Sequence, residues 1–585
     1  MRILFDSKKE EYKSPFGCLY PNQVCRLNIR IPSSVQTGDV RIVVQTENGG
    51  HYGEFPMNFA KAEGPYDLWQ GEFSLHQPGL YFYFFRITGH TGTFRLFKCS
   101  DDTNMEDGAL WQISCVPADF TTPDWAKGAV IYQIFPDRFH KAGSCDLTNK
   151  LQPYTLHEQW NEEVHWQPNE KGQVLNNDFF GGNFRGITEK MDYIASLGVD
   201  ILYLNPIGKS FSSHRYDTGD YKTPDPMLGT EEEFTAMCDA AHARGIRVIL
   251  DGVYSHTGDN SLYFDKYGNF GGKGAYCDPD SPYRSWYQFK QYPHTYNSWW
   301  GFDTLPTVNK ADPGFIDYII TGKDSVLAHW LALGADGFRL DVVDELPDEF
   351  VSLLKRHLRK LRPDALLMGE VWEDASNKIA YDVRRRYFTD SQLDSVMNYP
   401  YRTAILKFLR GEDDGWNFRN TVMTIWENYP RQAALCNMNL LGTHDTPRIL
   451  TALVDDFDGS RQELANRRLS PEQRELARKR LMLATVLQYT LPGSPSLYYA
   501  DETGMEGGKD PFNRRTYPWG NEDQELLAHF RKLGQLRKNH PALRLGDIEF
   551  SQASDGELCF TRTYENQSIK IYVNQKTNTY TITEA

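Results

Sequence analysis

The sequence contains no apolar run long enough to cross a bilayer, and it has no excess of basic residues. Lys and Arg number 63 against 78 Asp and Glu, which gives a formal net charge of −15 at pH 7. Proteins that bind nucleic acid or anionic lipid usually present a basic face, so this balance disfavours both partner classes. We therefore expect neither nucleic acid nor membrane as a partner, and a neutral ligand would suit the charge.

Cysteine is scarce and lacks metal-binding spacing. There are nine cysteines, an odd number, and no Cys-x-x-Cys pair occurs. This usage is typical of buried small side chains in a reducing compartment rather than of a disulfide framework or a cysteine zinc site. The first ten residues, MRILFDSKKE, contain no apolar stretch of signal-peptide length. These observations predict a cytoplasmic location.

Both ends of the chain show the two-residue period of β-strands. Apolar and polar residues alternate in Cys-Arg-Leu-Asn-Ile-Arg-Ile over 25–31, and turn signals stand at 47–50 and 89–92. We therefore predict an N-terminal β-sandwich within residues 1–120. Alternation returns after about residue 540, which predicts a small C-terminal β domain over 541–585.

The middle of the chain, 121–540, alternates short apolar segments with amphipathic ones. Eight segments have the character of buried strands, at 129–134, 201–205, 247–251, 337–341, 366–370, 395–399, 439–443 and 496–499. Helical patterns lie between several of them, such as Ile187 to Leu197 and Glu231 to Arg244. Eight strands with intervening helices predict an α/β fold, a (β/α)8 TIM barrel, with a doubly wound parallel sheet as the structural alternative.

One stretch of this region lacks a regular pattern. Residues 254–310 are rich in Gly, Asp, Tyr and Trp, including Trp286, Tyr287, Trp299 and Trp300. Loops of this length inside a domain are usually functional. We expect an inserted loop domain that overhangs the binding groove.

Polar residues close four of the predicted strands, and four of them are carboxylates. Active groups of TIM barrels project from the carboxyl ends of the strands, so these side chains should meet at one mouth. An Arg and a His accompany them, and the set is Asp251, His256, Arg339, Asp341, Glu370 and Asp445. A lone Asp at a strand end is more often a helix cap, but the group together indicates a site.

Gathered carboxylates repel one another, which raises at least one pKa. A retaining glycosidase needs this arrangement: one ionised carboxylate attacks the anomeric carbon, and a protonated neighbour about 5 Å away donates to the leaving oxygen. Arg339 would keep its carboxylate partner ionised. The residues therefore favour glycoside hydrolysis.

Four segments match a known sequence pattern, and the match extends over essentially the whole chain. They are Asp251-Gly-Val-Tyr-Ser-His256, Gly337-Phe-Arg-Leu-Asp341, Gly369-Glu370-Val-Trp and Thr443-His444-Asp445. In these the chain resembles the α-amylase family, glycoside hydrolase family 13. The resemblance implies Asp341 as nucleophile, Glu370 as acid/base, and Asp445 as a third carboxylate that grips sugar hydroxyls.

The resemblance implies further substrate contacts. His214 and Tyr216, in Ser212-Ser-His-Arg-Tyr-Asp217, resemble residues that bond to and stack beneath the sugar at the cleavage subsite. Asp510 and Arg514 resemble an ion pair that contacts the next glucose unit. The polar lining of the cleavage subsite would comprise Asp251, His256, Arg339 and His444.

Other segments look like the neopullulanase, cyclomaltodextrinase and amylopullulanase branches. Asp178-Phe-Phe-Gly-Gly182, Gly442-Thr-His-Asp-Thr-Pro447 and a β-sandwich before the barrel fit them. The branches imply a starch-binding-like N-terminal module and a homodimer through it. Two segments depart from the neopullulanase pattern, Leu305-Pro-Thr-Val-Asn309 and Val342-Val-Asp344-Glu345, which leaves the preference between α-1,4 and α-1,6 bonds open.

The sequence gives no support for a metal. Ser255 stands where the family usually has the Asn that ligates calcium in many α-amylases, and the loop Lys141 to Lys150 lacks a dense Asp/Asn cluster. We expect no required cofactor and no metal ligands, with structural calcium unsupported.

The expected function is hydrolysis, with retention, of α-1,4 glucosidic bonds in maltodextrins, starch, pullulan or cyclodextrins. Cleavage of α-1,6 bonds is left open. A plain α-amylase and a transglycosylase of the same family are alternatives, because acceptor choice depends on the shape of the subsites. A catalytically silent glucan-binding protein on the same fold is the alternative from another class.

Overall fold

The computed structural model describes residues 2–99, 102–455 and 458–584. The chain forms two compact units, which are treated separately: one comprises 1–121, 373–394 and 416–434, and the other comprises 122–372, 395–415 and 435–585. Among the described residues, no helix combines the length and apolar character needed to span a membrane.

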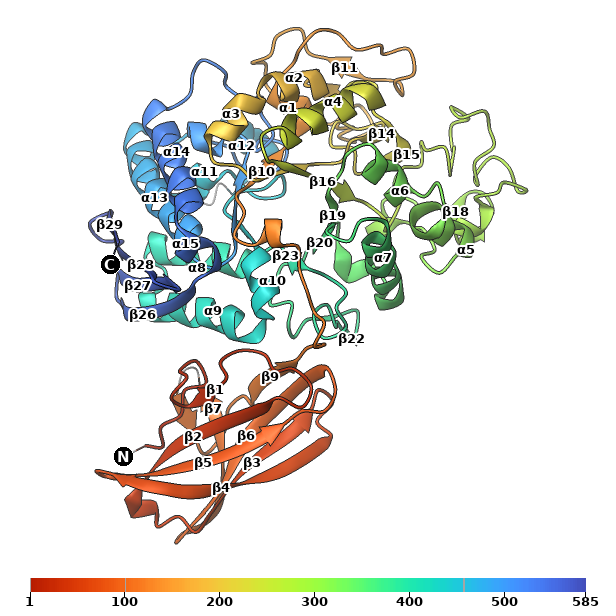
Figure 1. The fold of residues 1–585 in the computed structure, drawn as a ribbon. Helices are drawn as coiled ribbons and strands as arrows, with labels where there is room; N and C mark the ends of the chain where they lie inside the picture. Colours follow the sequence, from red (N-terminus) through yellow and green to blue (C-terminus); the bar gives the residue numbers. More distant parts are fainter. Residues whose placement is uncertain (1, 100–101, 456–457, 585) are drawn as a thin grey trace. The chain divides into compact units, whose positions relative to one another are not determined.

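The first unit is built on an antiparallel sheet of nine strands, drawn in red and orange in Figure 1. Alternate residues of β2 and β3 are fully buried because the pleat turns them to one face. These side chains enclose a core with Phe5, Tyr83, Phe85 and Trp111. The strands are β1 (Lys13–Ser14), β2 (Val24–Pro32), β3 (Asp39–Thr46), β4 (His51–Glu63), β5 (Tyr66–Ser74), β6 (Gly79–Gly89), β7 (Gly92–Cys99), β8 (Asp102–Asn104) and β9 (Trp111–Cys115).

Two later segments of the chain belong to the same unit. They include β21 (Ile379–Ala380), β22 (Val383–Arg384) and most of α9 (Gly415–Asn428). Glu427 of α9 is buried, and its Oε1 lies 2.8 Å from Nζ of the buried Lys13. Ser7 donates to the other carboxylate oxygen of Glu427. A buried charge requires such a partner, so the distant segment is an integral part of this unit.

The second unit contains eight parallel strands, ordered β23-β20-β19-β16-β13-β10-β25-β24. A parallel bridge between Met397 and Met438 joins the two ends of this order and closes the barrel. The strands are almost wholly buried because helices cover them outside and their own side chains fill the interior. They are β10 (Ile131–Ile134), β13 (Ile201–Leu204), β16 (Arg247–Gly252), β19 (Gly337–Leu340), β20 (Leu366–Gly369), β23 (Ser395–Val396), β24 (Met438–Leu440) and β25 (Ser494–Tyr498).

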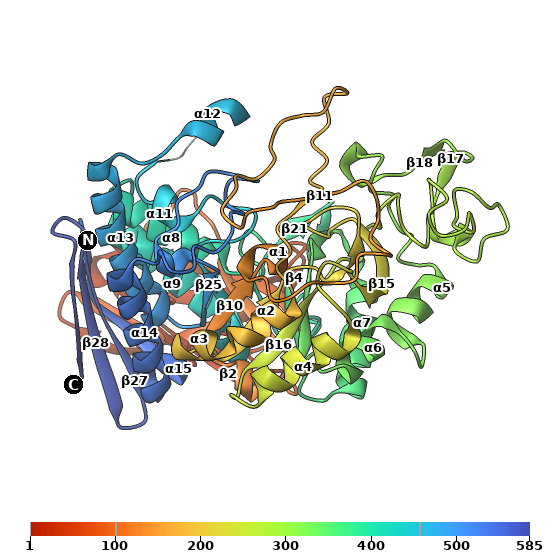
Figure 2. The ribbon, with the colours of Figure 1, turned by 90° about the horizontal axis from the view of Figure 1, so that it is seen from above.

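Helices surround the barrel, as the two views in Figures 1 and 2 show. The predicted helix over 231–244 is α4, which starts with a capping box of Thr230 and Glu233. The segment 187–197 forms parts of two short helices, α2 and α3, which meet at Lys190. The helices of this unit are α1 (Pro136–Phe139), α2 (Phe184–Glu189), α3 (Met191–Ser196), α4 (Glu231–His242), α5 (Pro313–Ile316), α6 (Val326–Ala332), α7 (Asp348–Leu361), α8 (Tyr399–Arg410), α11 (Ile449–Ala452), α12 (Arg461–Asn466), α13 (Pro471–Thr490), α14 (Gln524–Asn539) and α15 (Pro541–Leu545); α10 (Arg431–Cys436) spans the boundary between the units.

The stretch 254–310 is irregular, with only the short strands β17 (Phe289–Gln291) and β18 (Thr295–Tyr296) and two 3-10 turns. Its inner aromatic residues pack on one another: the ring of Tyr263 stacks on Trp286, and Phe264 lies edge-on to Tyr296. The loop therefore has a small core of its own, which holds its outer aromatic residues in place.

The C-terminal part is a four-stranded antiparallel sheet of β26 (Asp547–Ser554), β27 (Glu557–Tyr564), β28 (Gln567–Asn574) and β29 (Thr579–Glu584). Alternating residues such as Leu558, Phe560, Ile569 and Ile571 are buried. The (β/α)8 barrel with antiparallel β-sheet at both ends of the chain confirms the predicted fold class.

Candidate active site

Adjacent barrel strands place three carboxylates at one end of the barrel. Asp251 is the second-last residue of β16, Asp341 follows β19, and Glu370 follows β20. The parallel register pairs Leu340 with Gly369, so the next residues, Asp341 and Glu370, lie side by side. Neighbouring strands are about 4.8 Å apart, which is close to the carboxylate separation of a retaining glycosidase.

One guanidinium group connects these carboxylates. Nη1 of the fully buried Arg339 lies 2.7 Å from Oδ1 of Asp251 and 3.0 Å from Oδ1 of Asp341. Its Nη2 lies 2.8 Å from Oε2 of Glu370. Three carboxylates therefore surround a single fixed positive charge.

A strained turn after the strand supplies a further donor. The backbone N–H of Val342 donates to Oε2 of Glu370 at 2.8 Å. Val342 has a φ of 41°, in the left-handed region, where a β-branched residue is unfavourable. The indole N–H of Trp372 donates to the other oxygen of Glu370 at 3.0 Å, and its ring stacks on Tyr399 with centroids 3.9 Å apart. The carboxylate is held firmly from several sides.

Two tyrosines hold the third carboxylate. The hydroxyl groups of Tyr203 and Tyr216 each donate to Oδ2 of Asp251 at 2.7 Å. The amide of Asn205 donates to the Tyr216 oxygen at 3.0 Å, and the Tyr216 ring stacks nearly parallel to His444. This network presents Tyr216 as a rigid aromatic face.

The hydrogen bonds of His444 determine where its proton lies. The side-chain amide of Gln133 donates to Nδ1 at 3.0 Å, so Nδ1 is the acceptor and Nε2 carries the proton. Nε2 lies 2.6 Å from the Tyr216 oxygen and 3.1 Å from Oδ2 of Asp445. His444 thus links Tyr216 to the fourth carboxylate.

The remaining predicted residues adjoin this network. Arg514 lies 2.9 Å from Asp510 and 3.7 Å from Asp445, and its Nε donates to the His444 carbonyl. Nε2 of His256 lies 3.1 Å from the Tyr216 carbonyl. The ring of His214 lies 5.9 Å from that of Tyr216. The structure therefore brings together all eleven predicted site residues.

Burial and charge set the protonation of the cluster. Burial raises the pKa of Asp341 well above its usual range, and the nearby carboxylates raise it further, although Arg339 lowers it. Burial likewise raises the pKa of Asp251. Burial therefore favours the protonated form of these two carboxyl groups, and Arg339 favours their ionised form. Burial lowers the pKa of His256 to about 4 and that of His444 well below its usual value, so both imidazoles are neutral.

Sequence reasoning missed three residues of this network, namely Gln133, Tyr203 and Asn205. Each is a polar or amphipathic residue in or directly after an apolar strand, β10 or β13. Each occupies a position like that of Asp251 in β16, but its side chain is uncharged and belongs to none of the four family segments.

Two tryptophans of the long loop are held by a residue of the turn that follows Asp341. The indole N–H groups of Trp299 and Trp300 donate to the two oxygens of Glu345, at 2.5 and 2.7 Å. Trp299 lies 5.2 Å from the ring of His256, and Trp300 is 73% exposed. The turn and the loop together present an exposed aromatic face beside the site.

The loop 141–150 satisfies its polar groups with protein side chains. Asn183 accepts from the N–H of Ala142 and donates to its carbonyl. Nζ of the buried Lys150 lies 2.6 Å from Asp225. An ammonium group and amide bonds thus take up oxygens that a calcium ion would require.

The comparisons with known proteins agree with this geometry. The alpha-amylase catalytic domain matches residues 133–519. An amylopullulanase of Thermoanaerobacter thermohydrosulfuricus is 35% identical, covering 96% of this chain and 40% of that protein. A cyclomaltodextrinase of Geobacillus thermopakistaniensis is 33% identical, covering 78% of this chain and 70% of its own. The chain spans only 31 to 49% of the length of three amylopullulanases that it matches.

Solved structures give the same result. The type III pullulan hydrolase of Thermococcus kodakarensis matches with a TM-score of 0.66 and 27% identity, covering 98% of this chain and 94% of that one. A debranching enzyme of Nostoc punctiforme matches with a TM-score of 0.61 and 30% identity, over 78% and 91% of the two chains. With a matched catalytic domain, an eight-stranded barrel and the clustered acids, this chain belongs to the alpha-amylase family of glycoside hydrolases.

Proposed function

We propose that the chain is a retaining α-glucan hydrolase that cleaves α-1,4 and α-1,6 glucosidic bonds. The observation that carries this proposal is the pairing of Asp341 with Glu370 at neighbouring strand ends, with Arg339 bonded to both. A nucleophile and a proton donor at this spacing lie on opposite sides of one glycosidic bond.

In the first half of the reaction, a carboxylate oxygen of Asp341 attacks the anomeric carbon. Glu370 gives its proton to the glycosidic oxygen, and the bond between that oxygen and the anomeric carbon breaks. The products are a glycosyl ester on Asp341 and a free sugar hydroxyl. Arg339, 3.0 Å from Asp341, stabilises the ionised form of this nucleophile.

In the second half, Glu370 takes a proton from water, and the water oxygen attacks the anomeric carbon of the ester. The bond from that carbon to the Asp341 oxygen breaks, which releases the carboxylate. Two inversions at one carbon give net retention. Asp445, Arg514 and the N–H of His444 face the region where sugar hydroxyls would bind. Tyr216 offers its ring to the apolar face of the sugar, with His214, Asp251, His256 and Asp510 as the surrounding polar contacts.

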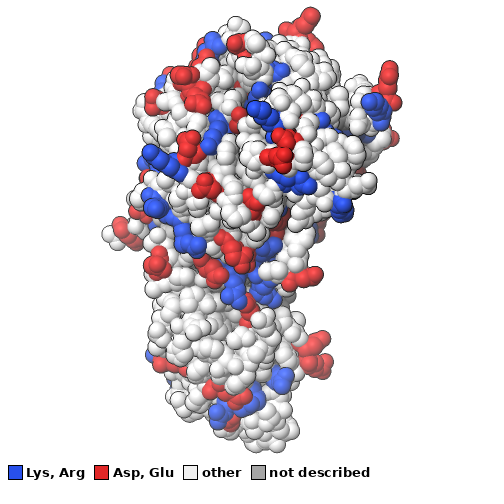
Figure 3. All heavy atoms as spheres, turned by 90° about the vertical axis from the view of Figure 1, so that its right-hand side faces the viewer, with Lys and Arg blue, Asp and Glu red and all other residues white. Residues whose placement is uncertain are grey.

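The substrates that we propose are maltodextrins, starch, pullulan and cyclodextrins. Similarity to proteins named amylopullulanase, cyclomaltodextrinase and neopullulanase supports this range. The exposed ring of Trp300 also supports it, because stacking tolerates more sugar orientations than directed hydrogen bonds do. On the face in Figure 3, acidic and basic side chains are interspersed.

We also propose a cytoplasmic location and pairing of two chains through a starch-binding-like N-terminal module. All nine cysteines are unpaired, which supports a reducing compartment. The broad N-terminal sheet supports the module, and the similarity to the cyclomaltodextrinase and neopullulanase branches supports pairing.

Incubation with soluble starch, pullulan and cyclodextrin, followed by chromatography, tests the substrates. We expect products from starch and from pullulan, and proton NMR should show the first sugar as the α-anomer. The variant Trp300→Ala should lose more activity on polysaccharides than on maltotriose. Cleavage of starch without cleavage of pullulan would indicate a plain α-amylase. A β-anomeric product would exclude the retaining mechanism.

A further inference from the structure

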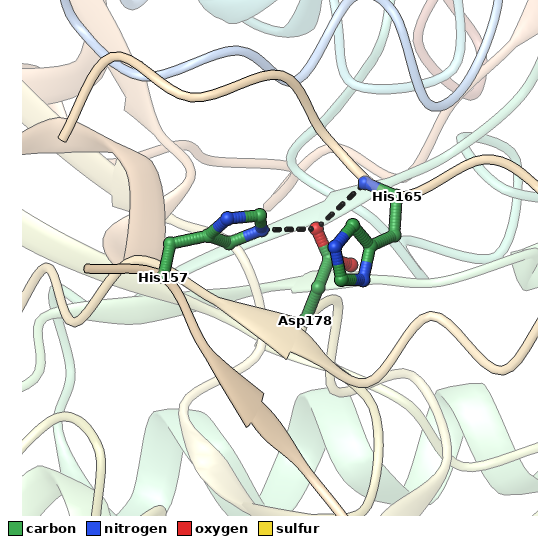
Figure 4. A group of neighbouring side chains, drawn as sticks. All are labelled: His157, His165 and Asp178. Atoms are coloured by element: carbon green, nitrogen blue, oxygen red, sulfur yellow. Dashed lines mark hydrogen bonds and ion pairs between the residues drawn. The ribbon is translucent and has the colours of Figure 1, made fainter. Parts of the chain in front are cut away.

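A second group of coordinating side chains lies outside the eleven residues of the site. His157, His165 and Asp178 each offer one ligand atom, and these atoms all lie within 4.8 Å of one another (Figure 4). His157 follows β11 (Thr155–Leu156), and Asp178 begins β12 (Asp178–Phe179), which pairs with β11 in parallel. His165 lies on the loop between these strands. The strand pair therefore fixes two of the three ligands.

The ring of His157 is held between two carboxylates. Its Nδ1 lies 2.9 Å from Oε2 of Glu162, and its Nε2 lies 3.2 Å from Oδ2 of Asp178. The ring stacks on Phe180 at 3.9 Å, so it cannot turn away. A neutral imidazole has one proton, so only one of the two carboxylates can receive a hydrogen bond from it. The other ring nitrogen requires an additional positive charge, which a second proton or a metal ion can supply.

The local charge is negative and favours a bound cation. The carboxylates in contact here are Asp137, Glu162 and Asp178, and the only cation bonded to them among the described residues is Arg138. Arg138 is 2.7 Å from Asp137 and 3.7 Å from Asp178, so its main partner is Asp137. Three carboxylates and one guanidinium give this group a net charge of −2, with the two imidazoles left aside. One divalent cation neutralises it.

The geometry points to a site for a divalent transition-metal ion, and we propose that His157, His165 and Asp178 are its protein ligands. Tetrahedral zinc bonds of about 2.1 Å place neighbouring ligand atoms about 3.4 Å apart. The separation of 3.2 Å between His157 Nε2 and Asp178 Oδ2 is close to that value. The exposed ring of His165 has to move closer to reach this spacing, since the three ligand atoms lie within 4.8 Å of one another. Its backbone is already in place, because its N–H donates to Asp178 at 3.1 Å.

The surrounding contacts match those of known metal sites. A metal-bound histidine commonly donates its second ring N–H to a carboxylate, which fixes the tautomer. Glu162 takes that position on Nδ1 of His157 and leaves Nε2 free for the ion. Two imidazoles and one carboxylate suit zinc, nickel, copper or cobalt better than calcium. The exposure of His165 leaves room for water as a fourth ligand.

The proposed site departs from the expectation of no metal ligands, and it leaves the proposed chemistry unchanged. None of its three ligands is bonded to Asp341, Glu370 or Asp445. The ion would instead fasten the loop 157–178 to the strand pair. Dialysis against a chelator should therefore lower the thermal midpoint and leave the initial rate of glucan cleavage nearly intact, and calcium should not restore the midpoint.

Zinc binding to the 585-residue chain without an affinity tag tests the proposal. After equilibrium dialysis at pH 7.5, elemental analysis should show about one zinc ion per chain, and zinc should raise the thermal midpoint. His165→Ala, in an exposed side chain, should weaken zinc binding at least tenfold and abolish the shift in the midpoint. Glu162→Gln should weaken binding about tenfold or more through the His157 tautomer. His51→Ala, an exposed histidine of the other unit, is the matched control and should bind as wild type does.

Two results would overturn the proposal. One is wild-type protein without stoichiometric zinc, which would show that protons alone bridge the carboxylates. The other is zinc binding that His165→Ala leaves unchanged, which would place the ion elsewhere. Circular dichroism of each variant distinguishes loss of the site from loss of the fold. Because the readout is binding, the result is independent of the proposed hydrolase activity.

Discussion

Arg339 has three carboxylate partners, and it influences which of these carboxyl groups is ionised and which is protonated. A guanidinium stays protonated at any working pH, so it can keep one neighbour ionised while burial favours a proton on another. The reaction requires both states at once. Asp341 must act as an anion and Glu370 as an acid, on the same fixed cation.

At the residue scale, Asp341→Asn should reduce turnover by at least about a thousandfold. An amide cannot form the glycosyl ester that divides the reaction into two easier steps. The melting temperature should change little, because an amide of the same shape also removes a charge from a crowded cluster. Rates on maltotriose measure the effect, and Asp280→Asn, in an exposed acid of the long loop, is the control. A folded variant that keeps more than a tenth of wild-type activity would disprove the assignment of Asp341 as the nucleophile.

The charged residues of this site could be predicted because parallel strands bring their carboxyl ends together. That rule placed Asp251, Asp341 and Glu370 at one mouth from their positions alone. It could not show that Arg339 forms ion pairs with all three, because such contacts depend on the side-chain rotamers. It also could not show that Gln133 sets the tautomer of His444, since that contact joins residues 311 positions apart.

At the element scale, helices α13 and α14 meet the C-terminal strand β29 at one buried histidine. Nε2 of His529 lies 2.9 Å from the hydroxyl of Thr485, and Nδ1 lies 3.5 Å from that of Tyr580. Burial lowers the pKa of His529 to about 4. The observed boundaries of the barrel strands differ from the predicted ones by up to three residues, in both directions.

This histidine predicts a pH dependence of stability. Between pH 6.5 and 4, the unfolded chain binds a proton at His529 and the folded chain does not, so acid favours unfolding. Relative to His529→Gln, wild type should lose roughly 2 kcal/mol as the pH falls from 7 to 5. Urea unfolding of both proteins at each pH measures this difference. The carboxylates are common to both proteins, so their contribution to the change in unfolding free energy cancels. Equal losses would show that His529 is protonated in the folded state.

At the scale of the whole molecule, the first unit is assembled from segments more than 400 positions apart in the chain. No local pattern could have shown that residues 416–434 belong with the N-terminal sheet, because the signal lies in a contact rather than in a period. Lys13 and Glu427 form that contact, and both side chains are almost fully buried.

Lys13→Met should therefore destabilise the protein by roughly 3 to 5 kcal/mol, since it leaves the Glu427 carboxylate buried without its cation. The double variant Lys13→Met, Glu427→Leu removes both charges and should recover most of the loss. Thermal or urea unfolding of the two variants measures the effect, with Lys61→Met on the exposed side of the same sheet as the control. A loss of less than 1 kcal/mol in the single variant would show that water reaches Glu427.

The shared construction of this unit limits how such a gene can recombine. A crossover after codon 121 would transfer the sheet without the two segments, 373–394 and 416–434, that complete it. The incoming sheet would then meet foreign partners, with Glu427 facing whatever residue replaced Lys13. We therefore expect the N-terminal region to be inherited together with the barrel region that contains the two later segments. Chimaeras that exchange all three segments together should fold best.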